Sequence, residues 1–137
     1  MIQFKHNIGF TILSALLLLA SCSSREKRSM EVTATAYNSV ESQTSGDPAI
    51  TAWGDTLVPG MKAIAISRDL LDSGFYHTME LNIEGLPGSY KVLDKMNLRW
   101  TKKIDIYMGT DVSLAREWGK KKVTINWLPA EEGEEKN

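Results

Sequence analysis

Short segments in which apolar and polar residues alternate fill most of the chain between residues 31 and 128. The clearest alternation runs from Met79 to Glu84, and Val123, Ile125 and Trp127 repeat it near the end. A period of two is typical of a β-strand with one buried face. Further segments of similar length are rich in apolar or β-branched residues: 32–37, 63–66, 89–93 and 104–108.

About six short strands in fewer than one hundred residues predict a mainly β fold, a small closed or nearly closed barrel. Periodicity alone does not choose among barrel topologies. One short helix is also expected: Thr110 or Asp111 can cap it, Leu114 and Trp118 give it an apolar stripe, and Gly119 can end it.

Two tryptophans on apolar stripes, Trp118 and Trp127, are expected in the core. Lys120 to Lys122 follow the helix. They are either solvated charges at a helix C-terminus, which is the preferred interpretation, or a patch for an anionic surface.

The start of the 137-residue chain carries a targeting signal rather than a part of the fold. Ile8 to Ala20 is almost wholly apolar, but these 13 residues are too few to span a bilayer comfortably. The segment ends in Leu19-Ala20-Ser21-Cys22, which resembles the lipobox of bacterial lipoproteins. The alternatives are an ordinary secreted protein, or a short anchor helix, in which the single cysteine is a stray thiol.

The lipobox resemblance and the composition of the chain together predict four segments. Residues 1–21 would be the signal peptide, 22–30 the lipidated cysteine and its tether, 31–128 the folded domain and 129–137 an acidic disordered tail. The protein would be anchored in a membrane of the cell envelope through Cys22. Ser23 follows the cysteine, which by resemblance to enterobacterial sorting favours the outer membrane, facing the periplasm.

The charge balance argues against nucleic acid as a partner. After removal of the signal, 15 Lys and Arg face 17 Asp and Glu. Binding to phosphate backbones requires a clear basic excess. The cell wall is a more natural place to look for a substrate.

The residue types leave carboxylates as the candidate catalytic groups. The mature chain has one histidine, His77, expected on the surface or in a loop, so neither a metal centre nor a Ser-His-Asp triad is expected, and no cofactor is implied. Asp105 interrupts the apolar run 104–108, and Asp94 precedes it by eleven positions. Two neighbouring carboxylates raise one pKa, and a protonated acid can donate to a glycosidic oxygen. The alternative is a pair of surface aspartates at strand ends.

Aromatic side chains near these acids could stack on sugar rings. Tyr37, Trp53, Trp100 and Tyr107 lie in or near the expected loops and the Asp105 face. Each could instead belong to the core or plug the barrel.

Several motifs occur in an order typical of one family. They are Ala34-Thr35-Ala36-Tyr37, Ile50-Thr51-Ala52-Trp53-Gly54, Pro59-Gly60 with Ala63-Ile64-Ala65-Ile66, the pair Asp94 and Asp105, and Trp118-Gly119 before the last strand. From Val32 to Leu128 the chain resembles the three-aspartate (Asp-Asp-Asp, 3D) domain. That family is related to the C-terminal domain of membrane-bound lytic transglycosylase A and, more distantly, to rare lipoprotein A.

The resemblance implies a six-stranded double-psi β-barrel that acts on peptidoglycan glycan strands. Asp105 would be the catalytic acid and base, and Asp94 would tune or orient it. The bond between N-acetylmuramic acid and N-acetylglucosamine would be cleaved without water, leaving a 1,6-anhydro product. Tyr37, Thr51, Ser67 and Trp100 are the expected substrate-binding residues.

The chain departs from the family pattern at two places. Ser67 stands where the family has its first aspartate. Between Asp94 and Asp105 the family has a glycine-rich run, whereas this chain has bulky residues from Met96 to Thr101. Two further interpretations therefore stand beside the enzyme: a barrel that binds glycan without cleaving it, and a tethering protein without glycan contact.

Overall fold

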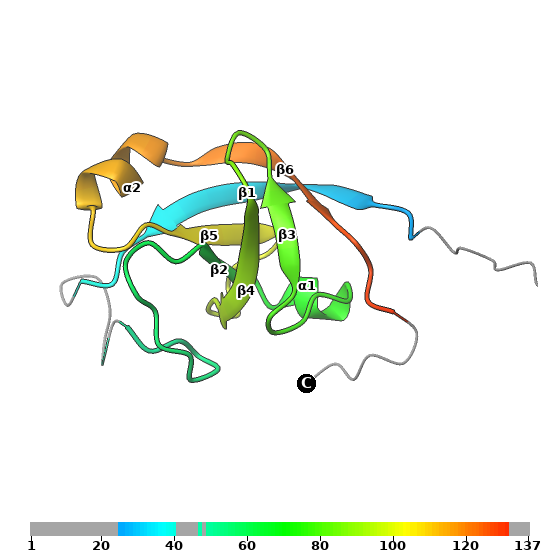
Figure 1. Ribbon diagram of the computed structural model, residues 1–137, viewed down its shortest axis with the longest axis horizontal. Coiled ribbons are helices and arrows are strands. Elements are labelled where there is room, and N and C mark those ends of the chain that lie inside the picture. The colour runs from blue at the N-terminus through cyan, green and yellow to red at the C-terminus, as the bar shows by residue number, and fades with distance from the viewer. Residues whose placement is uncertain (1–24, 41–46, 48, 132–137) are drawn as a thin grey trace, which may run out of the picture.

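The computed structural model describes residues 25–40, 47 and 49–131. The predictions for the signal segment, for Cys22 and for the tail beyond residue 131 lie outside them. Six strands close into a barrel in the order β1-β5-β2-β4-β3-β6 (Figure 1). They are β1 (Arg28–Tyr37), β2 (Ala63–Ile66), β3 (Glu80–Ile83), β4 (Ser89–Lys95), β5 (Lys103–Tyr107) and β6 (Lys121–Trp127). The expected mainly β, six-stranded barrel is confirmed.

Two of the six strand pairs are parallel. Strand β1 runs parallel to β5, and β2 runs parallel to β4, whereas the other four pairs are antiparallel. A parallel pair needs a crossover connection, so neither pair is a simple hairpin.

The barrel interior is filled by alternate residues of the strands. Ile64 and Ile66 of β2 and Ile104 and Ile106 of β5 are at most 1% exposed and pack in one cluster. Trp127 belongs to this cluster, as expected, and its ring lies 4.7 Å from that of Phe75. Trp118 is only partly buried and packs against the cluster from outside.

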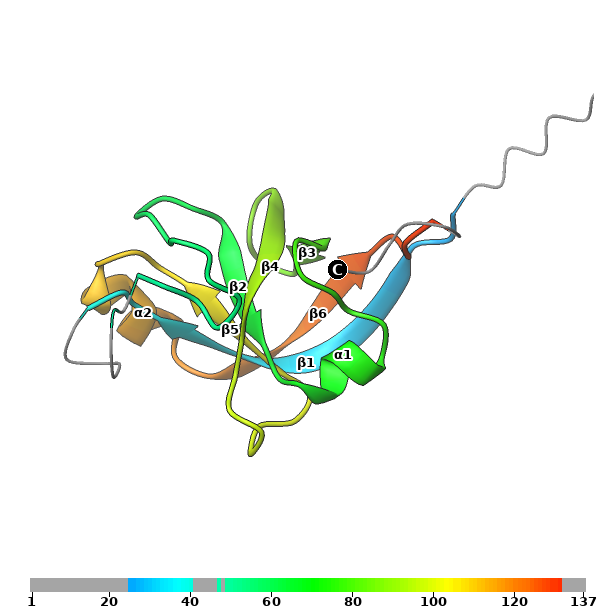
Figure 2. The same ribbon diagram turned by 90° about the horizontal axis from the view of Figure 1, so that it is seen from below.

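The expected helix is present as α2 (Val112–Trp118). The Asp111 carboxylate caps it by accepting a hydrogen bond from the Leu114 amide at 2.9 Å, and Gly119 ends it with a φ of 65°. A second helix, the single turn α1 (Asp69–Asp72), was not expected, because four residues are too few to show a helical period. The two helices lie at opposite ends of the barrel (Figures 1 and 2).

Strand β1 begins at Arg28, earlier than the domain start expected at residue 31. Arg28 pairs with Trp127 and Met30 pairs with Ile125, so backbone hydrogen bonding to β6 orders residues whose side chains give no strand signal. Arg25 extends the contact through an ion pair of 3.1 Å with Glu131. Within the described ranges, no helix is long and apolar enough to cross a membrane.

Candidate active site

Four residues form a row across four successive strands of the barrel, β1, β5, β2 and β4. Thr35 pairs with Asp105, Asp105 pairs with Ala65, and Ala65 pairs with Asp94. Residues in register on adjacent strands point to the same face of a sheet. The neighbours of Asp105 along β5, Ile104 and Ile106, face the barrel interior. The row therefore lies on the outer face, with a small alanine between the two acids.

A β-bulge brings Asp94 onto this face. The pairing of β2 with β4 shifts after Ile64, which pairs with Val92, so that Ala65 pairs with Asp94 and Leu93 is the extra residue. Regular alternation would have placed Asp94 on the inner face with Val92. Bulges occur often next to active sites, where they redirect a side chain.

Asp105 is a partly buried acid with a raised pKa. Burial is the main cause, and the charge of Asp94 adds to it. Two contacts act in the opposite direction: Thr35 donates a hydrogen bond from its Oγ1 to the Asp105 Oδ1 at 2.8 Å, and the Lys103 ammonium favours the ionised form. The net shift is upward, which is the direction that a general acid requires.

Asp94 is held by backbone amides rather than by side chains. Its Oδ1 accepts hydrogen bonds from the amides of Ala52 and Lys95, each at 2.8 Å. Burial raises the pKa of Asp94 above its usual value, although the two amides and the Lys95 charge lower it in part. The bond to Ala52 ties the acid to the loop that precedes β2.

Tyr37 lies close to both acids. Burial raises the pKa of its hydroxyl, and the charges of Asp94 and Asp105 raise it further. Its Oη is buried and has no hydrogen-bond partner among the described residues. An unsatisfied buried hydroxyl costs about 1–3 kcal/mol, so its presence calls for an explanation. A donor that stays protonated beside two acids is suited to bind a ligand oxygen.

The loop of residues 49–62 covers part of this outer face. Thr51 is buried, and its Oγ1 and the Asp55 amide are 3.0 Å apart. The Asp55 carboxylate lies 2.6 Å from His77 Nε2, and the His77 ring lies 5.0 Å from the ring of Trp53. These contacts fasten the loop whose Ala52 amide holds Asp94. His77 does lie in a turn, as expected, but its pairing with Asp55 was not foreseen.

The structure does not bring Ser67 to the site. Ser67 is fully buried, and its Oγ accepts a hydrogen bond from the Lys103 amide at 2.9 Å. Its hydroxyl therefore joins β5 to the end of β2. We assign it a structural role in place of the expected contact with substrate.

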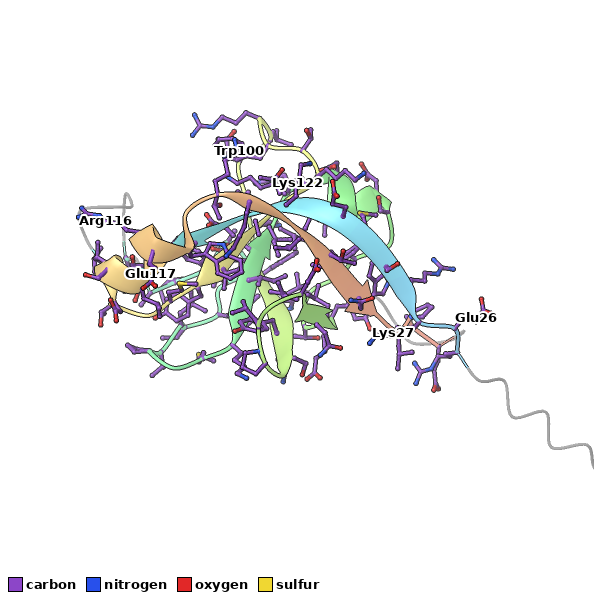
Figure 3. The ribbon with its side chains drawn as sticks, turned by 90° about the horizontal axis from the view of Figure 1, so that it is seen from above. Glu26, Lys27, Trp100, Arg116, Glu117 and Lys122 are labelled. Atoms are coloured by element: carbon purple, nitrogen blue, oxygen red, sulfur yellow. The ribbon has the colours of Figure 1, made fainter. Side chains whose placement is uncertain are left out.

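Trp100 reaches the site only through Lys103. It lies in the loop between β4 and β5 (Figure 3). The Lys103 Nζ is 3.7 Å from the centre of the Trp100 ring, and Arg99 approaches the same ring at 4.9 Å. Lys103 precedes Asp105 by two positions and shares its face. The Trp100 ring thus helps to position the Lys103 ammonium, which lowers the pKa of Asp105, and the same ring also contacts Arg99.

Sequence reasoning missed Thr35, Asp55 and Lys103. Thr35 stands in an expected strand, but nothing in the sequence shows which residue lies beside it on the neighbouring strand. In the part of the chain that the structure describes, no group of three His, Cys, Asp or Glu side chains could hold a metal ion.

Comparison with protein-family models finds no match, and no curated protein matches the chain.

Replacing Thr35 with valine is expected to raise the pKa of Asp105 further, because the hydrogen bond from Thr35 favours the ionised carboxylate. The measurement is a carbon NMR titration of the Asp105 carboxyl group. Thr33→Val is the matched control, since Thr33 lies on the same strand but pairs with Lys103. An equal effect of the two substitutions, or a lowered pKa in Thr35→Val, would contradict this reading.

Proposed function

We propose that this protein is an envelope lipoprotein that cleaves peptidoglycan glycan strands by lytic transglycosylation. The supporting observation is the row on the outer face, in which a carboxyl group of raised pKa, Asp105, lies in register with Thr35 and near Asp94. The resemblance to the three-aspartate domain also implies that Asp105 is the catalytic residue. The row supplies an acid, a group that tunes it and, in Tyr37, a hydrogen-bond donor.

In the proposed reaction Asp105 acts twice. Its proton first passes to the glycosidic oxygen between N-acetylmuramic acid and N-acetylglucosamine, and the bond from that oxygen to the muramic C1 breaks. The Asp105 carboxylate then takes the proton of the muramic 6-hydroxyl, and O6 bonds to C1. The product is a 1,6-anhydro sugar, no water is consumed, and Asp105 is protonated again.

The surroundings of Asp105 suit both steps. Burial and the charge of Asp94 favour the protonated form for the first step. Thr35 and Lys103 favour the ionised form that the first step leaves behind. A group with a pKa near the working pH is neither always protonated nor always ionised, so it can serve first as an acid and then as a base. Asp94 acts through its charge and is a tuning residue rather than a group that touches the reacting atoms.

A second candidate function is a barrel that binds glycan without cleaving it. The observation that favours it is the altered segment before Asp105. Bulky residues replace the family's glycines there, and Lys103 and Arg99 lie over the Trp100 ring. A blocked approach on that side would leave binding without catalysis.

Incubation of the purified protein with isolated sacculi separates the two functions. The enzyme releases soluble muropeptides and lowers the turbidity of the suspension. The binding module sediments with the sacculi and releases nothing. Neither release nor co-sedimentation would contradict both proposals.

The anchor is tested separately. Cys22→Ser is expected to move the protein from the membrane fraction to the soluble fraction, because the thiol that would carry the lipid is gone. Ser24→Ala serves as the control, since it leaves the lipobox intact. Fractionation followed by immunoblotting gives the result, and a membrane-bound Cys22→Ser variant would contradict the lipoprotein proposal.

A further inference from the structure

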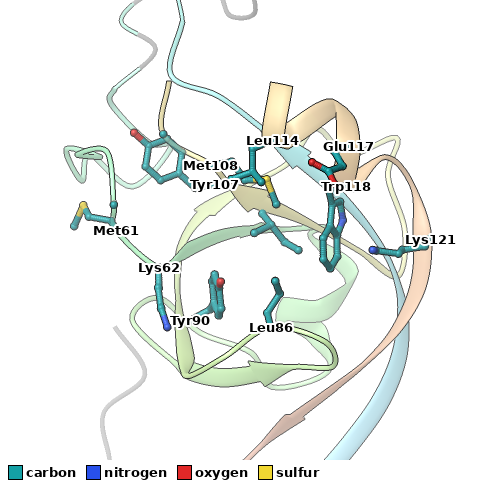
Figure 4. Close-up of a pocket in the computed structure, with 13 residues that line it drawn as sticks. Met61, Lys62, Leu86, Tyr90, Tyr107, Met108, Leu114, Glu117, Trp118 and Lys121 are labelled. Atoms are coloured by element: carbon teal, nitrogen blue, oxygen red, sulfur yellow. The ribbon is translucent and has the colours of Figure 1, made fainter. Parts of the chain in front are cut away.

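A pocket of about 540 Å³ opens at the end of the barrel next to α2 (Figure 4). Its walls come from the loop before β2, the β3–β4 turn, β4, the end of β5, α2 and the start of β6. They are mostly apolar, and Leu86, Met108, Tyr90 and Trp118 supply much of the surface. A concave, largely apolar site of this size with a few polar groups is the usual form of a ligand pocket.

Charged groups stand at the rim without partners of opposite charge. Lys62 and Lys121 line the pocket, and neither forms an ion pair with a carboxylate among the described residues. The Lys62 ammonium donates a hydrogen bond to the Pro87 carbonyl oxygen, and its Nζ lies 5.8 Å from the Tyr90 ring centre. The Lys121 Nζ lies 3.7 Å from the Trp118 ring centre. Glu117 is the one carboxylate in the described lining and has no ion pair there either.

The pocket borders the candidate active site through Tyr107. Its ring lines the pocket and lies 5.6 Å from the ring of Tyr37, which is close to both acids. Tyr107 follows Asp105 by two positions on the same face of β5, a rise of about 7 Å along the strand. One molecule can therefore bind at Asp105 and place another of its groups in the pocket.

We propose that this pocket binds the acidic peptide stem carried by the muramic acid residues of the glycan strand, an inference that rests on the proposed function. Such a stem joins small apolar residues to several carboxylates and one side-chain amino group. Lys62 and Lys121 take carboxylates, and Glu117 takes the amino group. The apolar wall, with Leu86 and Met108, contacts the alanine methyl groups.

The test measures binding of a free stem to the full-length chain in detergent by calorimetry. The probe is the tetrapeptide L-alanyl-γ-D-glutamyl-meso-diaminopimelyl-D-alanine. Replacing Lys62 or Lys121 with glutamine is expected to weaken binding about tenfold, because each substitution removes a charged partner. Lys120→Gln is the matched control: it removes the same charge from the neighbouring position, which does not line the pocket. No binding, or equal binding by all three variants, would overturn the proposal.

A second arm separates this inference from the proposed function. Strands stripped of their stems by an amidase are compared with intact strands as substrates. Slower cleavage of stripped strands supports the stem pocket, whereas equal cleavage overturns it and leaves the transglycosylase standing. If no strand is cleaved but the tetrapeptide still binds in a lysine-dependent way, the stem-pocket proposal is supported and the transglycosylase proposal is contradicted. The Asp105→Asn variant should bind the tetrapeptide as the native chain does.

Discussion

Asp105→Asn is expected to reduce strand cleavage by at least about 100-fold, because general acid–base catalysis contributes about 10²- to 10⁴-fold. The amide has the shape of the carboxyl group and can still accept the Thr35 hydrogen bond, but it cannot give up a proton. Release of muropeptides from sacculi by native and variant protein measures the effect. Full activity in the variant would remove Asp105 from the mechanism.

The same substitution is expected to stabilise the fold near neutral pH. Because the folded-state pKa of Asp105 is raised above 3.8, the native chain loses stability as pH rises from the ordinary aspartate range through that raised pKa. The asparagine variant has no such loss. Its advantage in thermal unfolding should be largest above the raised pKa and vanish at more acid pH.

Asp72→Asn is the control for both measurements. Asp72 is exposed at the end of α1, away from the row on the outer face. Its replacement should leave cleavage intact and shift the unfolding temperature little. A variant of Asp105 that is less stable than the native chain at neutral pH would contradict the picture of a buried acid of raised pKa.

Ile64→Ala is expected to cost about 2–5 kcal/mol of unfolding free energy, the usual range for removing a large buried side chain. Ile64 is fully buried in β2 and pairs with Val92 and Ile106 of the neighbouring strands, so its removal leaves a cavity in the barrel. Domains of this size are stable by only about 5–15 kcal/mol. The melting temperature should fall by on the order of 10 °C or more.

Ile50→Ala is the control, because Ile50 is 46% exposed. Its cost should stay well below that of Ile64→Ala in the same unfolding measurement. An equal loss of unfolding free energy at the two positions would contradict the assignment of Ile64 to the barrel core.

Much of the fold could be predicted because its signals are local. Alternation marks β3 and β6, and apolar runs mark β2 and β5, while Asp111 and Gly119 mark the ends of α2. The first residues of β1 were not predicted as strand, because they are ordered by pairing with β6 and not by their own side chains. The single-turn helix α1 was not predicted, because four residues are too few to show a helical period.

The candidate site was harder to predict, because its geometry depends on contacts between distant segments. The sequence offers Asp94 and Asp105 as acids, but alternation alone would place Asp94 on the inner face, and only the bulge at Leu93 turns it outward. Thr35 meets Asp105 across 70 residues of chain, and His77 meets Asp55 across 22. Ser67 was expected to bind substrate, but it is fully buried and its hydroxyl accepts a hydrogen bond from the backbone of β5.

The most direct test of the central claim is the chemical nature of the new chain ends. Purified peptidoglycan is digested with the native protein and with Asp105→Asn, and the products are read by mass spectrometry. Lytic transglycosylation predicts muramic ends one water lighter than hydrolysis products, from the native protein only. Hydrated ends would show a hydrolase, and intact strands in both digests would show that this barrel does not cleave glycan.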